Sequence, residues 1–136
     1  MKTKQIALFA VLAGLLMVST PILAHHGYAA YDMTATKSLK GTITEFSMAN
    51  PHSHISFDVK DASGNVEHWV VETGAPLRGM KAGGFDFDSL KPGDVVTINF
   101  HPGKSTGHIG AMISVEFPDG RVLPRKQAPG GDAPSN

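Results

Sequence analysis

The sequence predicts an all-β domain with little helix, folded as a five-stranded Greek-key barrel of the OB type. Five short segments either alternate apolar and polar residues or are rich in β-branched residues, and turn residues separate them. An irregular link at residues 74–93 follows the third segment and divides the strands into three and two. This order suits a small OB barrel, and an open β-sandwich is the alternative.

The expected strands are Thr42–Ser47, His54–Lys60, Val66–Thr73, Val95–Phe100 and Ile109–Phe117. The second is the clearest, because Ile55, Phe57 and Val59 alternate with polar residues as in a half-buried strand. Residues 61–65 form the expected hairpin turn that leads into the third strand.

Less regular structure is expected in the link and after the fifth strand. The link has room for one helical turn at Pro76–Met80, and Val122 with Leu123 can pair briefly. Residues 124–136 are rich in Pro, Gly, Ala and Ser, so they should form a disordered tail.

The first 24 residues have the order of a secretory signal peptide. Lys2 and Lys4 precede an uncharged apolar run, Ile6–Val18, which is shorter than the ~20 residues that span a bilayer. Cleavage is expected after Ala24, with Ala29 as the alternative. The chain therefore divides into a signal peptide (1–24), an N-terminal arm (25–38), the barrel (39–123) and the tail (124–136). In a Gram-negative cell the mature protein would be periplasmic.

The composition excludes several classes of function. The chain has no cysteine, which excludes disulfides, thiolate metal sites, a cysteine nucleophile and a lipoprotein anchor. It carries 12 Lys and Arg against 12 Asp and Glu, and loss of Lys2 and Lys4 leaves a slightly acidic mature domain. Such a domain lacks the basic excess typical of nucleic-acid binding. No nucleic-acid partner is expected, and no membrane partner after signal cleavage.

All seven histidines lie beyond the expected signal peptide, and two of them open the mature chain. If cleavage follows Ala24, His25 has a free α-amine beside its imidazole, and His26 adds a further donor. Amine and imidazole nitrogens favour Cu(II), which binds most tightly among the divalent first-row ions. The alternative is a mobile polar terminus without metal.

His52 and His54 form a second pair, in the sequence Asn-Pro-His-Ser-His. In an extended strand, residues i and i+2 lie on one face, roughly 6.6 Å apart, so both imidazoles could bind one ion. The alternative is that His52 makes only hydrogen bonds while His54 faces solvent. Neither histidine pair matches a specific zinc signature such as H-E-x-x-H.

No catalytic constellation is recognised, so an enzyme is not expected. The chain has neither a phosphate-binding loop nor a G-x-S-x-G nucleophile motif, and its carboxylates are scattered over the strands. Trp69 with Phe46 and Phe57 could form a stacking platform for nucleic acid, but core packing suits the weak negative charge better.

Several motifs follow one another along the mature chain. They are His25–Asp32 (HHGYAAYD), Leu39–Ile43 (LKGTI), Ala49–His52 (ANPH), Trp69 with Glu72, Leu90–Val95 (LKPGDV) and Asp119 with Gly120. In this order they resemble small exported proteobacterial proteins grouped as a domain of unknown function, with an H-H-[SG]-x-A-x-[FY]-D start and a central N-P-H. The resemblance implies an exported OB-like barrel without an established activity. Its most distinctive positions match His25, His26, Asp32, Asn50, Pro51, His52, Trp69 and Glu72. Gly27 stands where serine is frequent.

Two hypotheses of function follow. In the first, the protein is a small periplasmic binding protein in which His25, His26 and His52, with His54 as a further candidate, hold Cu(II) or another divalent ion. In the second, it is a metal-independent module whose surface binds a periplasmic protein or a small ligand. That surface would contain Asn50, Pro51, Trp69 and Glu72.

Overall fold

A computed structural model of the chain describes residues 26–126. The predicted signal peptide, His25 and most of the predicted tail lie outside these residues. The elements in chain order are α2 (His26–Ala29), β1 (Lys37–Ser47), β2 (His54–Lys60), β3 (Val66–Glu72), α3 (Leu77–Ala82), β4 (Val95–Pro102), β5 (Ile109–Glu116) and β6 (Val122–Pro124). Between residues 26 and 126, no helix is long and apolar enough to cross a membrane.

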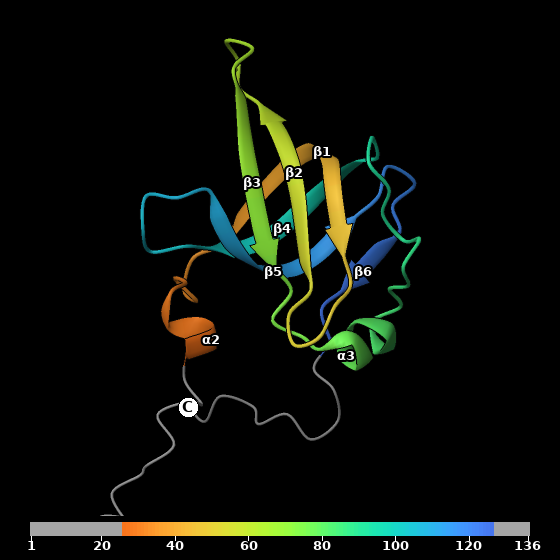
Figure 1. The fold of residues 1–136 in the computed structure, drawn as a ribbon. Coiled ribbons are helices and arrows are strands. Elements are labelled where there is room, and N and C mark those ends of the chain that lie inside the picture. Colours follow the sequence, from red (N-terminus) through yellow and green to blue (C-terminus); the bar gives the residue numbers. More distant parts are fainter. Residues whose placement is uncertain (1–25, 127–136) are drawn as a thin grey trace, which may run out of the picture.

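Five strands close into a barrel in the order β1-β2-β3-β5-β4 and back to β1 (Figure 1). All neighbouring pairs are antiparallel except β3 and β5, which run parallel and close the barrel. The short strand β6 extends the sheet beyond β5. With α3 between β3 and β4, this arrangement is that of an OB barrel, and the predicted fold class is confirmed.

The structure extends three of the expected strands. β1 begins at Lys37 rather than Thr42, because its first half pairs with β4 and only its second half pairs with β2. The sequence did not predict a strand there, because most residues of that first half are polar. β4 continues to Pro102, so His101 lies in a strand and not in a loop. β6 reaches Pro124, where the predicted tail was expected to begin.

The core fills the barrel with side chains that alternate inward along each strand. The largest fully buried ones include Ile43, Ile55, Phe57, Met80, Ile98, Phe100, Met112 and Val115. Burial of such side chains supplies the main driving force for the fold.

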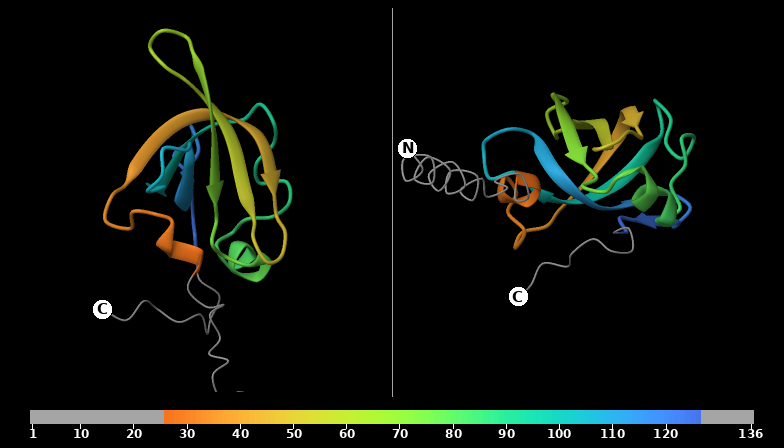
Figure 2. Two further views of the ribbon diagram at one scale, coloured as in Figure 1. Left: turned by 60° about the vertical axis from the view of Figure 1, so that its left-hand side comes forward. Right: turned by 60° about the horizontal axis from the view of Figure 1, so that its bottom comes forward.

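Asn50 Oδ1 accepts a hydrogen bond of 3.0 Å from the backbone N–H of Leu77, which ties the β1–β2 loop to α3. Figure 2 shows that α2 and α3 lie near the same end of the barrel but on different sides of it.

Gly110 permits the closure of the barrel. It pairs with Val71 across the parallel β3–β5 contact, and it is buried against the ring of Phe100. A Cβ at this position would overlap that ring, which is itself fully buried. A larger residue must therefore displace either the aromatic ring or the closing strand.

We expect Gly110→Ala to lower the free energy of unfolding by about 1–3 kcal/mol, the usual cost of overpacking a core. Urea denaturation measures the change. Gly107→Ala is the control, because a Cβ there meets only Ser105 Oγ, at 4.0 Å. Equal stability of the two variants would contradict this account of the closure.

Candidate functional site

The N-terminal arm folds back onto the barrel. Tyr31 is only 6% exposed and forms an isolated β-bridge with Gly103 at the end of β4. The backbone N–H of Asp32 donates to the carbonyl of Pro102 at 2.8 Å. Main-chain bonds and a buried ring therefore fix the part of the arm that follows the predicted mature N-terminus.

Asp32 ends the arm in a local turn. Its carboxylate accepts hydrogen bonds from the Thr34 hydroxyl at 2.6 Å and from the Thr34 backbone N–H at 3.0 Å. These bonds, the hydroxyl first, lower the pKa of the Asp32 carboxyl from its ordinary value, although the group is exposed to solvent. The turn sets the direction in which the chain enters β1.

Tyr31 also contacts the end of β3. Burial raises the pKa of Tyr31 to about 12, and a hydrogen bond to Glu72 and the charge of that carboxylate add to the effect. All three effects favour the neutral phenol beside the Glu72 carboxylate. Glu72, on the outer face of the β2–β3 pair, is therefore the residue that Tyr31 of the arm contacts.

His54 lies directly across from Glu72. The two residues pair in the register of β2 and β3, a position where the Cβ atoms are roughly 4.5–5.5 Å apart. On its other side, His54 Nε2 lies 3.7 Å from Glu45 Oε1 of β1. Ile55 and Phe57 occupy the inward positions of β2, so alternation places His54 on the outer face, where it is partly exposed. His54 is thus an accessible imidazole flanked by carboxylates on both neighbouring strands.

His52 occupies a different setting. It is exposed in the loop before β2, whereas the intervening Ser53 is fully buried and its hydroxyl bonds to the backbone of Ala49. Asn50 in the same loop is tied to α3, on a different side of the barrel end from α2 (Figure 2). His54 is therefore the predicted ligand that pairs with Glu72, the residue that contacts the arm.

No three His, Asp or Glu side chains within the described part of the chain are grouped so as to hold a metal ion. His26 is the first residue of α2, and His25 lies outside the described residues. A metal site at His54 therefore needs donors from the start of the mature chain.

A second contact holds the arm. The guanidinium carbon of Arg125 lies 5.1 Å from the centre of the Tyr28 ring, a cation–π contact. Gly74 has φ of +60°, and a Cβ there would lie 3.0 Å from the Tyr28 hydroxyl and 3.1 Å from Arg125 Nη1. Close approach of these two side chains to the backbone thus depends on the glycine.

The predicted partner surface is only partly exposed. Asn50, Pro51 and Glu72 are exposed, whereas Trp69 is 5% exposed. His108 stacks on the Trp69 ring with centroids 4.7 Å apart, and the indole N–H donates to Glu67 at 3.0 Å. Trp69 is a core and rim residue rather than an open binding surface.

Sequence reasoning missed Tyr28, Tyr31, Glu45 and Arg125 as parts of this site. Both tyrosines belong to the HHGYAAYD motif, and their spacing was the available signal. Nothing in the sequence indicated that the arm would lie against the end of β3, because this contact joins residues far apart along the chain.

A family model described as "Family of unknown function (DUF6152)" matches residues 12–112. The chain belongs to this family. The match includes the arm, β1 to β4 and the first half of β5, so it covers the candidate site at Glu72 and His54. No curated protein matches the chain significantly. Membership of DUF6152 thus assigns no activity, and the function must be argued from the site.

The Tyr31–Glu72 contact makes stability depend on pH in the alkaline range. The phenol has a pKa of about 12 in the folded protein against an ordinary value of 10.0. Its contribution is complete below pH 10.0 and should be lost as the pH rises through about 12. Tyr31→Phe should remove this component and should cost about 1 kcal/mol at neutral pH through the lost hydrogen bond.

Unfolding free energies from pH 8 upward, as far as the fold persists, measure this contribution. Tyr28→Phe keeps Tyr31 and is the matched control. Parallel pH profiles for the wild type and Tyr31→Phe would contradict the assignment.

Proposed function

We propose that this DUF6152 protein is an exported binding protein that holds a divalent metal ion, Cu(II) foremost, between its mature N-terminus and His54. The observation that carries the proposal is the docking of the arm through Tyr31 and Glu72, directly beside His54. The protein would hold or deliver the ion in the periplasm, without turnover.

The N-terminus supplies the nitrogen donors. Cleavage after Ala24 makes His25 the first residue, so its α-amine and imidazole can chelate one ion, with His26 as a further donor. From Tyr28, which Arg125 holds, back to His25 the chain spans about 5 Å as the helix α2 and up to about 10 Å if that turn unwinds, so the proposal requires the donors of His25 to lie within this reach of His54. Nitrogen donors of these types favour Cu(II) over the other divalent first-row ions.

His54 supplies the donor from the barrel. Its Nε2 lies near Glu45, which leaves Nδ1 for a metal ion. A carboxylate beside a metal-binding imidazole orients the ring and raises its basicity, and Glu45 can have this role. Glu72, which holds Tyr31, adds negative charge that favours a cation at the same place.

The exposed loop at Asn50 and Pro51 supports a second candidate, a metal-independent interaction module. Both residues are exposed, yet Asn50 is fixed to α3 and the nearby Ser53 is buried. A rigid exposed loop of this kind can present a constant surface to a periplasmic protein or a small ligand. Such a module would bind its partner equally well after removal of all metal.

The mature protein is expected to begin at His25. Cleavage after Ala29 would remove Tyr28 and with it the contact to Arg125, whereas cleavage after Ala24 keeps both anchors of the arm. Mass spectrometry of the untagged protein purified from periplasm measures the N-terminus. A mature chain that begins at Ala30 would contradict the proposed metal site.

The mature protein should bind one equivalent of Cu(II) with an electron paramagnetic resonance spectrum typical of several nitrogen ligands. His54→Ala should weaken binding roughly tenfold or more and change the spectrum, because removal of even an outer-shell partner costs 10–100-fold. One extra alanine before His25 should do the same, since it moves the α-amine.

His68→Ala is the matched control. His68 is an exposed histidine on the outer face of β3 and pairs with Asp58 rather than with the arm. His52→Ala tests the other predicted ligand. An unchanged spectrum in His54→Ala, or equal losses in His54→Ala and His68→Ala, would refute the proposed site.

A further inference from the structure

A wedge-shaped hollow lies where β1 separates from β2. Their pairing ends at Thr42 and Asp58, after which β1 pairs with β4 only. Two residues beyond that last pair lie Lys40 on β1 and Lys60 on β2, which would stand opposite each other if the pairing continued. The hollow has a volume of about 600 Å³ and is lined by Lys40, Gly41, Thr42, Asp58, Lys60, Val66 and Val95.

Gly41 explains why β1 can turn at this point. A Cβ on Gly41 would lie 2.6 Å from the carbonyl oxygen of Asp58 and 2.7 Å from the Phe57 ring. The glycine therefore brings β1 close against β2 just before the strands separate. Gly41 faces the buried Phe57 ring, so its neighbour Lys40 lies on the outer face of β1.

The charges in the wedge are unbalanced. Asp58 is already paired with His68, with Asp58 Oδ1 and His68 Nδ1 2.5 Å apart. Among residues 28–126, neither Lys40 nor Lys60 has a carboxylate oxygen within 4.0 Å. Because both lysines line the same hollow, their like charges make its electrostatic potential positive. An anion between the two ammonium groups would lower this potential and accept charge-assisted hydrogen bonds.

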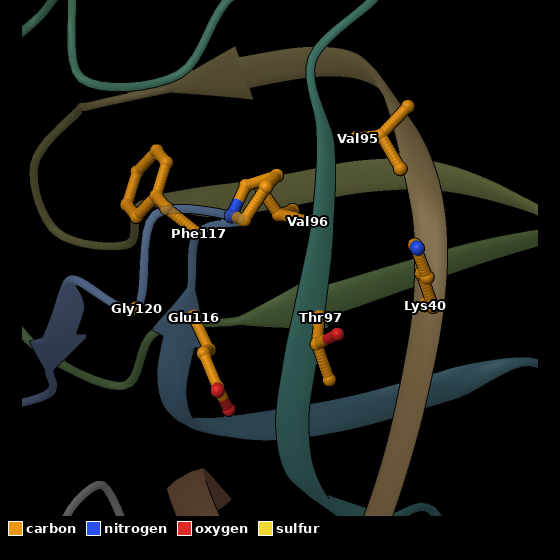
Figure 3. A pocket seen from close by; sticks show the side chains of 8 residues that line it. Lys40, Val95, Val96, Thr97, Glu116, Phe117 and Gly120 are labelled. Atoms are coloured by element: carbon orange, nitrogen blue, oxygen red, sulfur yellow. The ribbon is translucent and has the colours of Figure 1, made fainter.

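Apolar surface lies beside the two lysines. Val66 and Val95 line the wedge and are 45% and 42% exposed. A smaller hollow of about 200 Å³ shares Lys40 and Val95 and continues toward Thr97 and Phe117. Figure 3 shows Lys40 on β1 beside Val95 and Thr97 on β4. The surface thus combines a cationic position with an apolar one, and Glu116 also lines the smaller hollow.

We propose that the wedge binds the anionic head of a small amphipathic molecule, a carboxylate or a phosphate that bears an alkyl chain. The head lies between Lys40 and Lys60, and the alkyl chain covers Val66 and Val95. The two lysines supply the affinity for charge, and burial of the valines adds about 25 cal/mol per Å² of apolar area. This site is separate from the proposed metal site, and it requires no metal.

The test titrates metal-free mature protein with octanoate, octyl phosphate, octanol and inorganic phosphate, followed by nuclear magnetic resonance. Both amphipathic anions should bind saturably and shift the methyl signals of Val66 and Val95. Lys40→Gln with Lys60→Gln should weaken binding at least tenfold. Lys81→Gln with Lys104→Gln removes the same charge from α3 and the β4–β5 loop, and it should change binding less than twofold.

Several results would overturn the proposal. If octanol binds as tightly as octanoate, the lysines contribute nothing to the affinity. If inorganic phosphate binds as tightly as octyl phosphate, the valines contribute nothing to the affinity. Equal losses in the two double variants would indicate only a general charge effect. Circular dichroism of each variant verifies the fold.

Vesicles distinguish the source of the anion. Lysine-dependent sedimentation with phosphatidylglycerol vesicles, but not with phosphatidylcholine vesicles, would support the site and assign the anion to a lipid headgroup. Binding of octanoate without binding to either vesicle would support the site and assign a free amphipathic anion. Binding to neither vesicles nor soluble amphipathic anions would refute the proposal.

Discussion

The parallel pairing of β3 with β5 is the contact on which the rest of the structure depends. It converts an open sheet into a closed barrel, and only three residues of each strand take part. The tight packing of Gly110 against Phe100 makes room for it. Because β3 ends in this contact, Glu72 is held at a fixed place beside β5, where the arm crosses. The candidate site is therefore positioned by barrel closure rather than by its own residues.

Strand register determines which polar groups meet on the outer surface. Three histidines are each paired with a carboxylate: His54 with Glu45, His68 with Asp58, and His108 with Glu67. Their surroundings differ. His68 is highly exposed and His108 stacks on Trp69, whereas His54 lies opposite Glu72, the residue that holds the arm. Of these three pairs, the one at His54 thus lies opposite the residue that contacts the arm.

The path of β1 accounts for the positions of both proposed sites. β1 is shared between two halves of the barrel, and it passes from β2 to β4 at Gly41. Its second half carries Glu45 near His54, while its first half diverges from β2 and leaves a hollow that both Lys40 and Lys60 line. Negative charge therefore gathers at one end of the β1–β2 pair and positive charge at the other. A cation is favoured at the first and an anion at the second.

The sequence by itself determined the strands, their order and the barrel class, since alternation, turn residues and the interrupting link are local patterns. It also identified His54 and Glu72 as candidate site residues. It also favoured core packing for Trp69, which is buried. It did not reveal the first half of β1, whose outward residues are polar, or the stacking of His108 on Trp69. Only the tertiary structure decided that Tyr31 contacts Glu72, that His54 pairs with Glu72, and that Lys40 and Lys60 share a hollow. Each of these depends on contacts between distant segments, which barrel closure and strand register create and which no local pattern encodes.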